Sequence, residues 1–312
     1  QRTGKVGNVV ERRLEKALAR HAVQIVRPLA TTAAAELHEV RRDDRRAILK
    51  LWPQGHAGNE TAGVRLMQAW AGPHMVAILG AGTSGMAAYR EVVKHTDRVA
   101  LIDGGPLGTT CARVGCMPSK LLIAAADAAH EARHTDKFGV STGEVTIDGV
   151  AVMDRVRRER DRFVGFVNDA VDSFEDRHLI RQHARFIDDT TLELADGSRL
   201  TARTVIIATG SRAFIPPIEG LANTPYLTNE TIFDLPDFPE HLVILGGGPI
   251  GMEMAQAFVR LGAKVTVIEM GKALGRSDRA HAEIAIEALR AEGVTLLEGY
   301  KATKVEQDGK TI

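Results

Sequence analysis

The sequence predicts an α/β fold that contains two βαβ units, and three observations support this prediction. The apolar run Met75–Gly80 leads into a glycine-rich loop, a helical stretch and a second apolar run that ends at Asp103. The same order of elements recurs over His241–Glu269. Matching positions, such as Gly80 and Gly246, are 166 residues apart. Self-similarity at one offset indicates an internal duplication, and buried strands that alternate with helices are typical of a parallel sheet.

Each glycine-rich loop has the spacing of a dinucleotide-binding turn. The first glycine allows the sharp bend, the second lets a pyrophosphate approach the backbone, and the third lets the following helix pack closely on the strand. Asp103 and Glu269 each follow the last glycine of their loop by 18 residues, where a carboxylate can bind a ribose hydroxyl. The glycines concerned are Gly80, Gly82, Gly85, Gly246, Gly248 and Gly251. We therefore expect two Rossmann-like domains and two bound dinucleotides.

The acidic residue of the second unit favours NAD over NADP. A carboxylate at Glu269 would repel the 2′-phosphate of NADP, and Met270 supplies no cation beside it. Lys272 and Arg276 lie close to Glu269 in the sequence, and their positive charges favour NADP instead. The second domain is therefore expected to bind NAD.

The chain divides by composition into three parts. Residues 1–72 carry 13 Lys/Arg against 7 Asp/Glu, and helical periodicity at 10–26 with a basic stretch at 41–51 predicts a helical, basic extension of unknown origin. An interaction module in this extension is one interpretation. The first dinucleotide domain is expected at 75–235 and the second, incomplete, at 236–312.

Two further patterns fall between the glycine loops. A charged helical segment is expected at about 150–178, and a strand-rich segment follows at about 179–209. Asp196-Gly197 lies between two alternating apolar runs, which predicts a β-hairpin.

Overall composition excludes some classes of function. The 40 Lys/Arg balance the 40 Asp/Glu, which argues against a nucleic-acid-binding protein. No apolar stretch is long enough to cross a membrane. Two cysteines are too few for an extracellular disulfide framework, so we expect a cytoplasmic protein.

Both cysteines of the chain, Cys111 and Cys116, lie five positions apart. In a regular helix their Cα atoms would be about 8.7 Å apart, whereas a disulfide tolerates at most about 7 Å. A bridge therefore requires either that Cys111 precede the helix or that the helix be distorted, and Gly115 and Pro118 both weaken it. Two small buried side chains are the alternative interpretation. A metal site is less favoured, because no second Cys or His cluster completes a ligand set.

The motif GTTCARVGCMPSK, residues 108–120, resembles the redox-disulfide motif of the pyridine nucleotide-disulfide oxidoreductases of class I, which are flavoproteins. Its Pro-Ser-Lys ending is most similar to dihydrolipoyl dehydrogenases and mercuric reductases. The order of motifs also matches that family, since TVIIATGS and then GGGPIGMEMA follow the cysteines. The resemblance covers residues 75–312 and none of 1–72.

The resemblance implies a role for individual residues. Cys111 would be the interchange thiol that reacts with the substrate, Cys116 would face the flavin, and Lys120 would lie near the flavin and pair with Glu253. The residues implied for FAD are Gly80, Gly82, Gly85, Asp103, Thr110, Lys120, Ala184, Thr209 and Gly210. Those implied for NAD are Gly246, Gly248, Gly251 and Glu269. Two positions depart from the family: Asp103 replaces the usual Glu, and Pro249 replaces an aromatic residue that gates the nicotinamide in some members.

As a function, the resemblance implies dihydrolipoyl dehydrogenase. A lipoyl dithiol would reduce a Cys111–Cys116 disulfide, and the electrons would pass through FAD to NAD as hydride. The implied partners are a lipoyl-bearing protein, or a small dithiol or disulfide, and a second subunit in a homodimer. Mercuric reductase and other NAD(P)H-dependent disulfide reductases are the alternatives. So is a non-catalytic nucleotide-binding fragment, because the family's C-terminal interface domain and its His-Glu base are not found in this chain.

Overall fold

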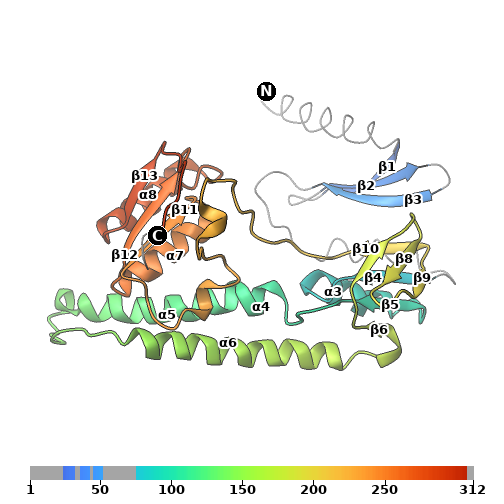
Figure 1. The fold of residues 1–312 in the computed structure, drawn as a ribbon, viewed down its shortest axis with the longest axis horizontal. Coiled ribbons are helices and arrows are strands. Elements are labelled where there is room, and N and C mark those ends of the chain that lie inside the picture. The colour runs from blue at the N-terminus through green and yellow to red at the C-terminus, as the bar shows by residue number, and fades with distance from the viewer. Residues whose placement is uncertain (1–23, 32–35, 43–44, 52–74, 308–312) are drawn as a thin grey trace. The chain divides into compact units, whose positions relative to one another are not determined.

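A computed structural model describes residues 24–31, 36–42, 45–51 and 75–307 of the protein. The described residues before 52, together with 94–96, form one compact unit, and the other described residues form a second. Figure 1 shows the elements of both units in the order of the chain. None of the helices in the described ranges is long and apolar enough to cross a membrane.

In the first unit, the described residues before 52 form a three-stranded antiparallel sheet. Its strands are β1 (Gln24–Thr31), β2 (Glu36–Arg42) and β3 (Arg45–Leu51), in the order β1-β2-β3. The helical prediction for 41–51 is therefore wrong. Arg42 pairs with Arg45 across the two strands, so only the two-residue sequence Asp-Asp separates them, and Asp is a common turn residue. Of the helix predicted at 10–26, the last three residues are in β1 and residues 10–23 lie outside the described ranges.

The first βαβ unit forms a four-stranded parallel sheet in the order β10-β4-β5-β6. Its strands are β4 (Val76–Leu79), β5 (Val99–Ile102), β6 (Leu179–Ile180) and β10 (Thr204–Ile207). Every residue of β4 and β5 is buried, which explains their continuous apolar sequence. Helix α3 (Thr83–Val92) follows the first glycine loop, as predicted.

A small antiparallel sheet packs against the same core. It consists of β7 (Ala184–Phe186), β8 (Thr191–Leu194) and β9 (Arg199–Thr201). Leu192 of β8 is fully buried in the cluster that β4 and β5 form. The hairpin predicted at Asp196-Gly197 is confirmed, because β8 and β9 pair antiparallel around it and Gly197 has a φ of +82°. The Asp196 carboxylate accepts the Ser198 hydroxyl at 2.6 Å, the Gln182 amide at 3.0 Å and the Ser198 N–H at 2.9 Å, and these bonds lower its pKa to about 2.

Three helices, one short and two long, lie between the glycine loops. They are α4 (Thr110–Val114), α5 (Cys116–Arg133) and α6 (Gly149–Asp172). Helices α5 and α6 lie side by side (Figure 1). The helical segment predicted at about 150–178 is confirmed over α6. Four single turns of 3-10 helix occupy Thr135–Phe138, Asp176–His178, Leu221–Asn223 and Ile232–Asp234.

The second βαβ unit forms a parallel sheet in the order β11-β12-β13. Its elements are β11 (His241–Leu245), α7 (Pro249–Arg260), β12 (Lys264–Glu269), α8 (Arg279–Ala291) and β13 (Thr295–Glu298). Leu122 of α5 and Met153 of α6 belong to the same buried cluster as Phe258 of α7 and Val265 of β12. One apolar core therefore joins helix α5, which begins at Cys116, to the second βαβ unit.

The two glycine loops have the same steric design. A Cβ on Gly85 would lie 1.7 Å from the carbonyl oxygen of Gly80, and a Cβ on Gly251 would lie 2.3 Å from that of Gly246. No atom lies within 4 Å of the position that a Cβ would occupy on Gly82 or Gly248. The third glycine of each loop is therefore required for packing, whereas the second leaves an open space in front of the helix.

This contrast predicts different effects of two substitutions in one loop. Gly85→Ala is expected to lower the free energy of unfolding by about 2–3 kcal/mol, the upper part of the range for overpacking a core. Gly82→Ser should change it by less than about 0.5 kcal/mol, because serine is a good N-cap residue and the space is open. Denaturant unfolding of the FAD-free protein measures both. Equal effects of the two substitutions would contradict the steric account.

Candidate active site

The helix that carries the cysteines is broken between them. Helix α4 ends at Val114, Gly115 has a φ of −141° and a ψ of −119°, and α5 begins at Cys116. A Cβ on Gly115 would lie 2.9 Å from the Thr110 carbonyl oxygen, so the chain approaches itself more closely there than a side chain permits. The predicted distortion of the helix is therefore present, and it is located at Gly115.

The residues before the break hold α4 in place. Thr109 has a φ of +60°, a strained conformation for a residue with a Cβ. Its hydroxyl accepts the N–H of Ala112 at 3.1 Å and so caps α4. Gly108, with a φ of +109°, lies against Val164 of α6, where a Cβ would be 2.8 Å from Cγ1. The N-cap of α4 and the close packing of Gly108 on α6 therefore stabilise the strained backbone at Thr109.

Cys111 and Cys116 are not bridged in this structure. Cys111 is half-buried and Cys116 is exposed. Burial raises the pKa of the Cys111 thiol, and the neighbouring Cys116 acts in the same direction. Cys111 is therefore protonated at neutral pH unless a base or a metal ion removes its proton.

Two side chains that the sequence analysis did not identify bond to the carbonyl groups around the break. The Asn229 side-chain amide donates to the Val114 carbonyl oxygen at 3.1 Å, and the Ser119 hydroxyl donates to that of Cys116 at 3.2 Å. Asn229 lies 115 residues from its partner and belongs to no motif. Only the folded structure could reveal its contribution.

Lys120 and Glu253 form an ion pair between α5 and α7. The Lys120 Nζ lies 2.5 Å from Glu253 Oε1, and the side chains are 63% and 29% exposed. The pairing that the resemblance implied is therefore present. Lys120 follows Cys116 by one helical turn, which places both residues on neighbouring positions of one helix surface. The role of the pair beside a flavin stays a prediction.

Several of the residues assigned to the first dinucleotide meet at the carboxyl edge of the parallel sheet. Gly80, Asp103 and Thr209 follow β4, β5 and β10, respectively. A Cβ on Gly80 would lie 2.4 Å from the Ala208 carbonyl oxygen, so the Thr209–Gly210 turn lies against the glycine loop. At the β5 side, Gly104 contacts the imidazole of His183, which directly precedes Ala184. This edge is where ligands bind in open parallel sheets.

The carboxylate of Asp103 bridges the glycine loop and the turn after β5. It accepts the N–H of Ala81 at 2.6 Å and the N–H of Gly105 at 2.7 Å. The open space at Gly82 lies at the amino end of α3, where no side chain caps the helix. Free N–H groups and a helix dipole at such a position favour a phosphate. These residues fit the pyrophosphate and ribose of FAD.

The second loop repeats this arrangement. The Glu269 carboxylate accepts the N–H groups of Gly247 and Gly271, both at 2.8 Å, at positions equivalent to Ala81 and Gly105. The Lys272 ammonium lies 3.9 Å from Glu298 Oε2, so its charge has another carboxylate partner. The uncapped amino end of α7 at Gly248 provides the second open phosphate site.

No hydrogen bond or ion pair joins the cysteine motif directly to either glycine loop within residues 75–307. The pair Lys120–Glu253 is one of the contacts by which the cysteine helix reaches the helix of the second loop. Thr110, which the resemblance assigned to FAD, begins α4 and supplies the carbonyl oxygen that faces Gly115.

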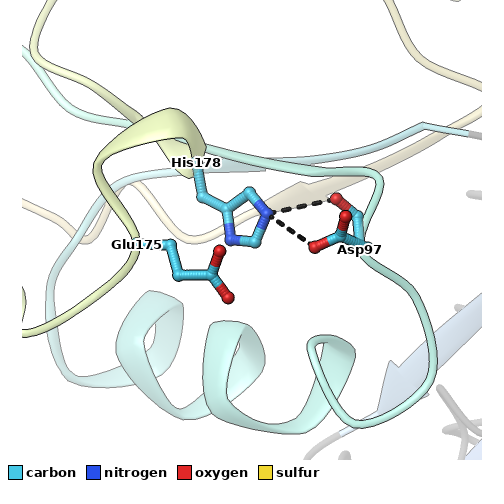
Figure 2. A group of neighbouring side chains, drawn as sticks. All are labelled: Asp97, Glu175 and His178. Atoms are coloured by element: carbon cyan, nitrogen blue, oxygen red, sulfur yellow. Dashed lines mark hydrogen bonds and ion pairs between the residues drawn. The ribbon is translucent and has the colours of Figure 1, made fainter.

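A cluster of Asp97, Glu175 and His178 has ligand types that could bind a metal ion (Figure 2). Its groups already have partners. The buried His178 ring bonds the Tyr89 hydroxyl at 2.9 Å through Nδ1 and the Asp97 carbonyl oxygen at 3.1 Å through Nε2. The Arg177 guanidinium lies 2.6 Å from Asp97 Oδ2 and 2.7 Å from Glu175 Oε2, and it lowers the pKa of Asp97. The cluster is therefore an ion-pair network that anchors the turn before β6.

Comparison with known proteins identifies the family. Residues 74–312 match the family described as pyridine nucleotide-disulphide oxidoreductase. The chain belongs to this family. It is 34% identical to mercuric reductase from Bacillus cereus over 74% of the chain and 37% of that protein. It is also 34% identical to mercuric reductase from Streptomyces lividans, over 79% of the chain and 53% of that protein.

Solved structures show the same fold. The HOCl-induced flavoprotein disulfide reductase RclA from Escherichia coli, in its Cu(II) complex, superposes with a TM-score of 0.64 and 27% identity. The match covers 75% of this chain and 51% of RclA. The chain thus spans about half the length of these relatives. The predicted α/β fold and the predicted family are confirmed, and the family supports FAD as a cofactor and the cysteines as a redox centre.

The raised pKa of Cys111 predicts how the two thiols react with iodoacetamide. Alkylation requires the thiolate, so Cys111 should reach half its maximal rate only above its ordinary pKa. In Cys116→Ala, the contribution of the neighbouring thiol is lost and burial remains, so the midpoint for Cys111 should move to lower pH. Mass spectrometry after timed labelling between pH 6 and 11 measures the profile. An unchanged or higher midpoint in Cys116→Ala would refute the assigned cause.

Proposed function

We propose that the full protein is an NAD(P)H-dependent flavoprotein reductase of the mercuric reductase type, whose cysteine pair binds a thiophilic metal ion, Hg(II), for reduction. The observation that carries this proposal is the 34% identity to mercuric reductases over 74% and 79% of the chain. The family match, over residues 74–312, includes both glycine loops and the cysteine pair. The solved relative RclA, whose structure is a Cu(II) complex, adds a second metal-binding example. Dihydrolipoyl dehydrogenase, the function expected from the cysteine motif, becomes the second candidate.

The raised pKa of Cys111 favours a metal ion over a disulfide as the substrate. A thiol with a raised pKa attacks a disulfide poorly without a base, because only the thiolate is the nucleophile. A soft metal ion instead binds sulfur strongly and displaces the proton when it binds. Cys116 is exposed and adjoins Cys111 across the break, so the two sulfurs can bind one ion together.

The electron balance of the proposed reaction is simple. NAD(P)H and Hg²⁺ give NAD(P)⁺, H⁺ and Hg⁰, so two electrons pass from the nucleotide to the metal ion. When bound, FAD supplies a two-electron carrier between the two substrates. The loop around Gly82, with Asp103 and Thr209, would hold FAD, and the loop around Gly248, with Glu269, would hold the nucleotide.

Lys120 would contribute through its charge. Its ammonium is fixed by Glu253 one turn after Cys116, and a cation so placed stabilises negative charge that develops on nearby sulfur. The Glu253 carboxylate keeps Lys120 in that place at the junction of α5 and α7. In this role the pair holds a cation one turn after Cys116 and does not itself bind the metal ion.

Two features keep dihydrolipoyl dehydrogenase as the second candidate. The Pro118-Ser119-Lys120 ending is shared with that enzyme, and the Glu269 carboxylate with Lys272 turned to Glu298 favours NAD. In that reaction electrons flow in the opposite direction, from a dithiol through the cysteines to NAD.

A pair of assays on the full-length, FAD-loaded protein separates the candidates. With HgCl₂ and excess small thiol, NADH or NADPH should be oxidised, and Cys111→Ser or Cys116→Ser should lower the rate by at least about 100-fold. The same preparation should reduce NAD with dihydrolipoamide much more slowly. NADH formation from dihydrolipoamide without any Hg(II)-dependent oxidation of NAD(P)H would reject the mercuric reductase proposal in favour of the second candidate.

A further inference from the structure

Helices α5 and α7 are joined by two ion pairs at the same spacing. Lys120 pairs with Glu253 at 2.5 Å, and Asp127 pairs with Arg260 at 2.5 Å. Each pair joins residues 133 positions apart in the sequence. Lys120 and Asp127 lie seven residues apart on α5, as Glu253 and Arg260 do on α7, so the two helices run parallel.

The order of charges selects one register. Helix α5 presents a cation and then an anion, and α7 presents an anion and then a cation. If α5 slipped along α7 by seven residues, one direction would place Lys120 opposite Arg260, and the other would place Asp127 opposite Glu253. Like charges so placed repel each other, so only the observed register pairs both sites.

Arg260 is the fixed point of this contact. Its Nε and Nη2 bind the two oxygens of Glu292 at 2.6 and 2.7 Å, and Gln256 donates to the same carboxylate at 2.9 Å. The side chains of Arg260 and Glu292 are only 17% and 15% exposed. Burial acts to raise the pKa of Glu292, but Arg260 and Gln256 outweigh it and the pKa is lowered. Bidentate pairing leaves Nη1 directed to Asp127.

Buried residues of both helices also belong to one apolar core. Ala126 of α5 and Ala255 and Ala257 of α7 are at most 1% exposed and belong to the shared core. Arg133, the last residue of α5, donates to the Arg260 carbonyl oxygen at 2.5 Å and closes the contact at its far end. The contact therefore extends from the first turns of α5 to its end.

We infer that Arg260, held by Glu292, is a positioning residue: through Asp127 it fixes the register of α5 on α7, and thereby the Lys120–Glu253 pair one turn after Cys116. The inference rests on the proposed function only in assigning that pair to electron transfer. The register itself is a property of the protein without FAD.

Asp127→Lys tests the inference, because Asp127 is 46% exposed and a lysine there faces Arg260 without being buried. Glu131→Lys is the matched control, with the same charge change at an exposed position of the same helix. In the FAD-free protein, hydrogen exchange over residues 116–123 should be at least about threefold faster in Asp127→Lys and unchanged in Glu131→Lys.

A double-mutant cycle in the full-length, FAD-loaded protein tests the link to Lys120–Glu253. Asp127→Lys should slow reduction of the flavin by NAD(P)H about threefold, and should have no further effect in a Glu253→Gln background. Identical exchange in Asp127→Lys and Glu131→Lys would overturn the register claim. The link to the ion pair would be overturned if Asp127→Lys exchanged faster but slowed flavin reduction equally with Glu253 and with Gln at position 253. If the unmodified protein shows no Hg(II)-dependent turnover, the proposed function is rejected. The hydrogen-exchange comparison still tests the register of α5 on α7.

Discussion

The close approach of Gly115 to the Thr110 carbonyl is the constraint on which the candidate site depends. Because no side chain fits there, the helix ends at Val114 and starts again at Cys116, and the two cysteines face each other across a break. The break starts α5 at Cys116, which places Lys120 one turn later and Asp127 at the junction with α7. A regular helix would separate the sulfurs and shift every later residue of α5 relative to α7.

The two dinucleotide loops show how one physical solution is used twice. In each, a carboxylate at the end of a strand accepts two backbone N–H groups and ties the glycine loop to the following turn. In each, the third glycine permits close packing and the second leaves an uncapped helix end open. Each loop therefore offers an open site for one phosphate group.

The parts of the molecule that local sequence determines were predicted correctly. Strands β4 and β11, their glycine loops and the hairpin at Asp196-Gly197 follow from apolar runs, glycine spacing and turn chemistry over short distances. The basic stretch at 41–51 was misassigned because its charges suggested a solvated helix, whereas a two-residue connection makes it a hairpin. Lys120–Glu253 was expected only from family resemblance. Asn229 and the Asp127–Arg260–Glu292 contacts were missed, since their partners lie 32 to 133 residues apart and no local pattern records them.

The central claim is that the cysteine pair exchanges electrons with a flavin. The most direct measurement is the absorbance spectrum of the full-length, FAD-loaded protein during two-electron reduction by NADH or dithiothreitol without oxygen. A thiolate at Cys116 in contact with oxidised flavin would add a long-wavelength shoulder while the main flavin bands persist, and this is the result predicted here. Flavin bands that bleach directly, with no shoulder at any stage, would contradict the claim, because the electrons would then remain on the flavin and the cysteines would be uncoupled from it.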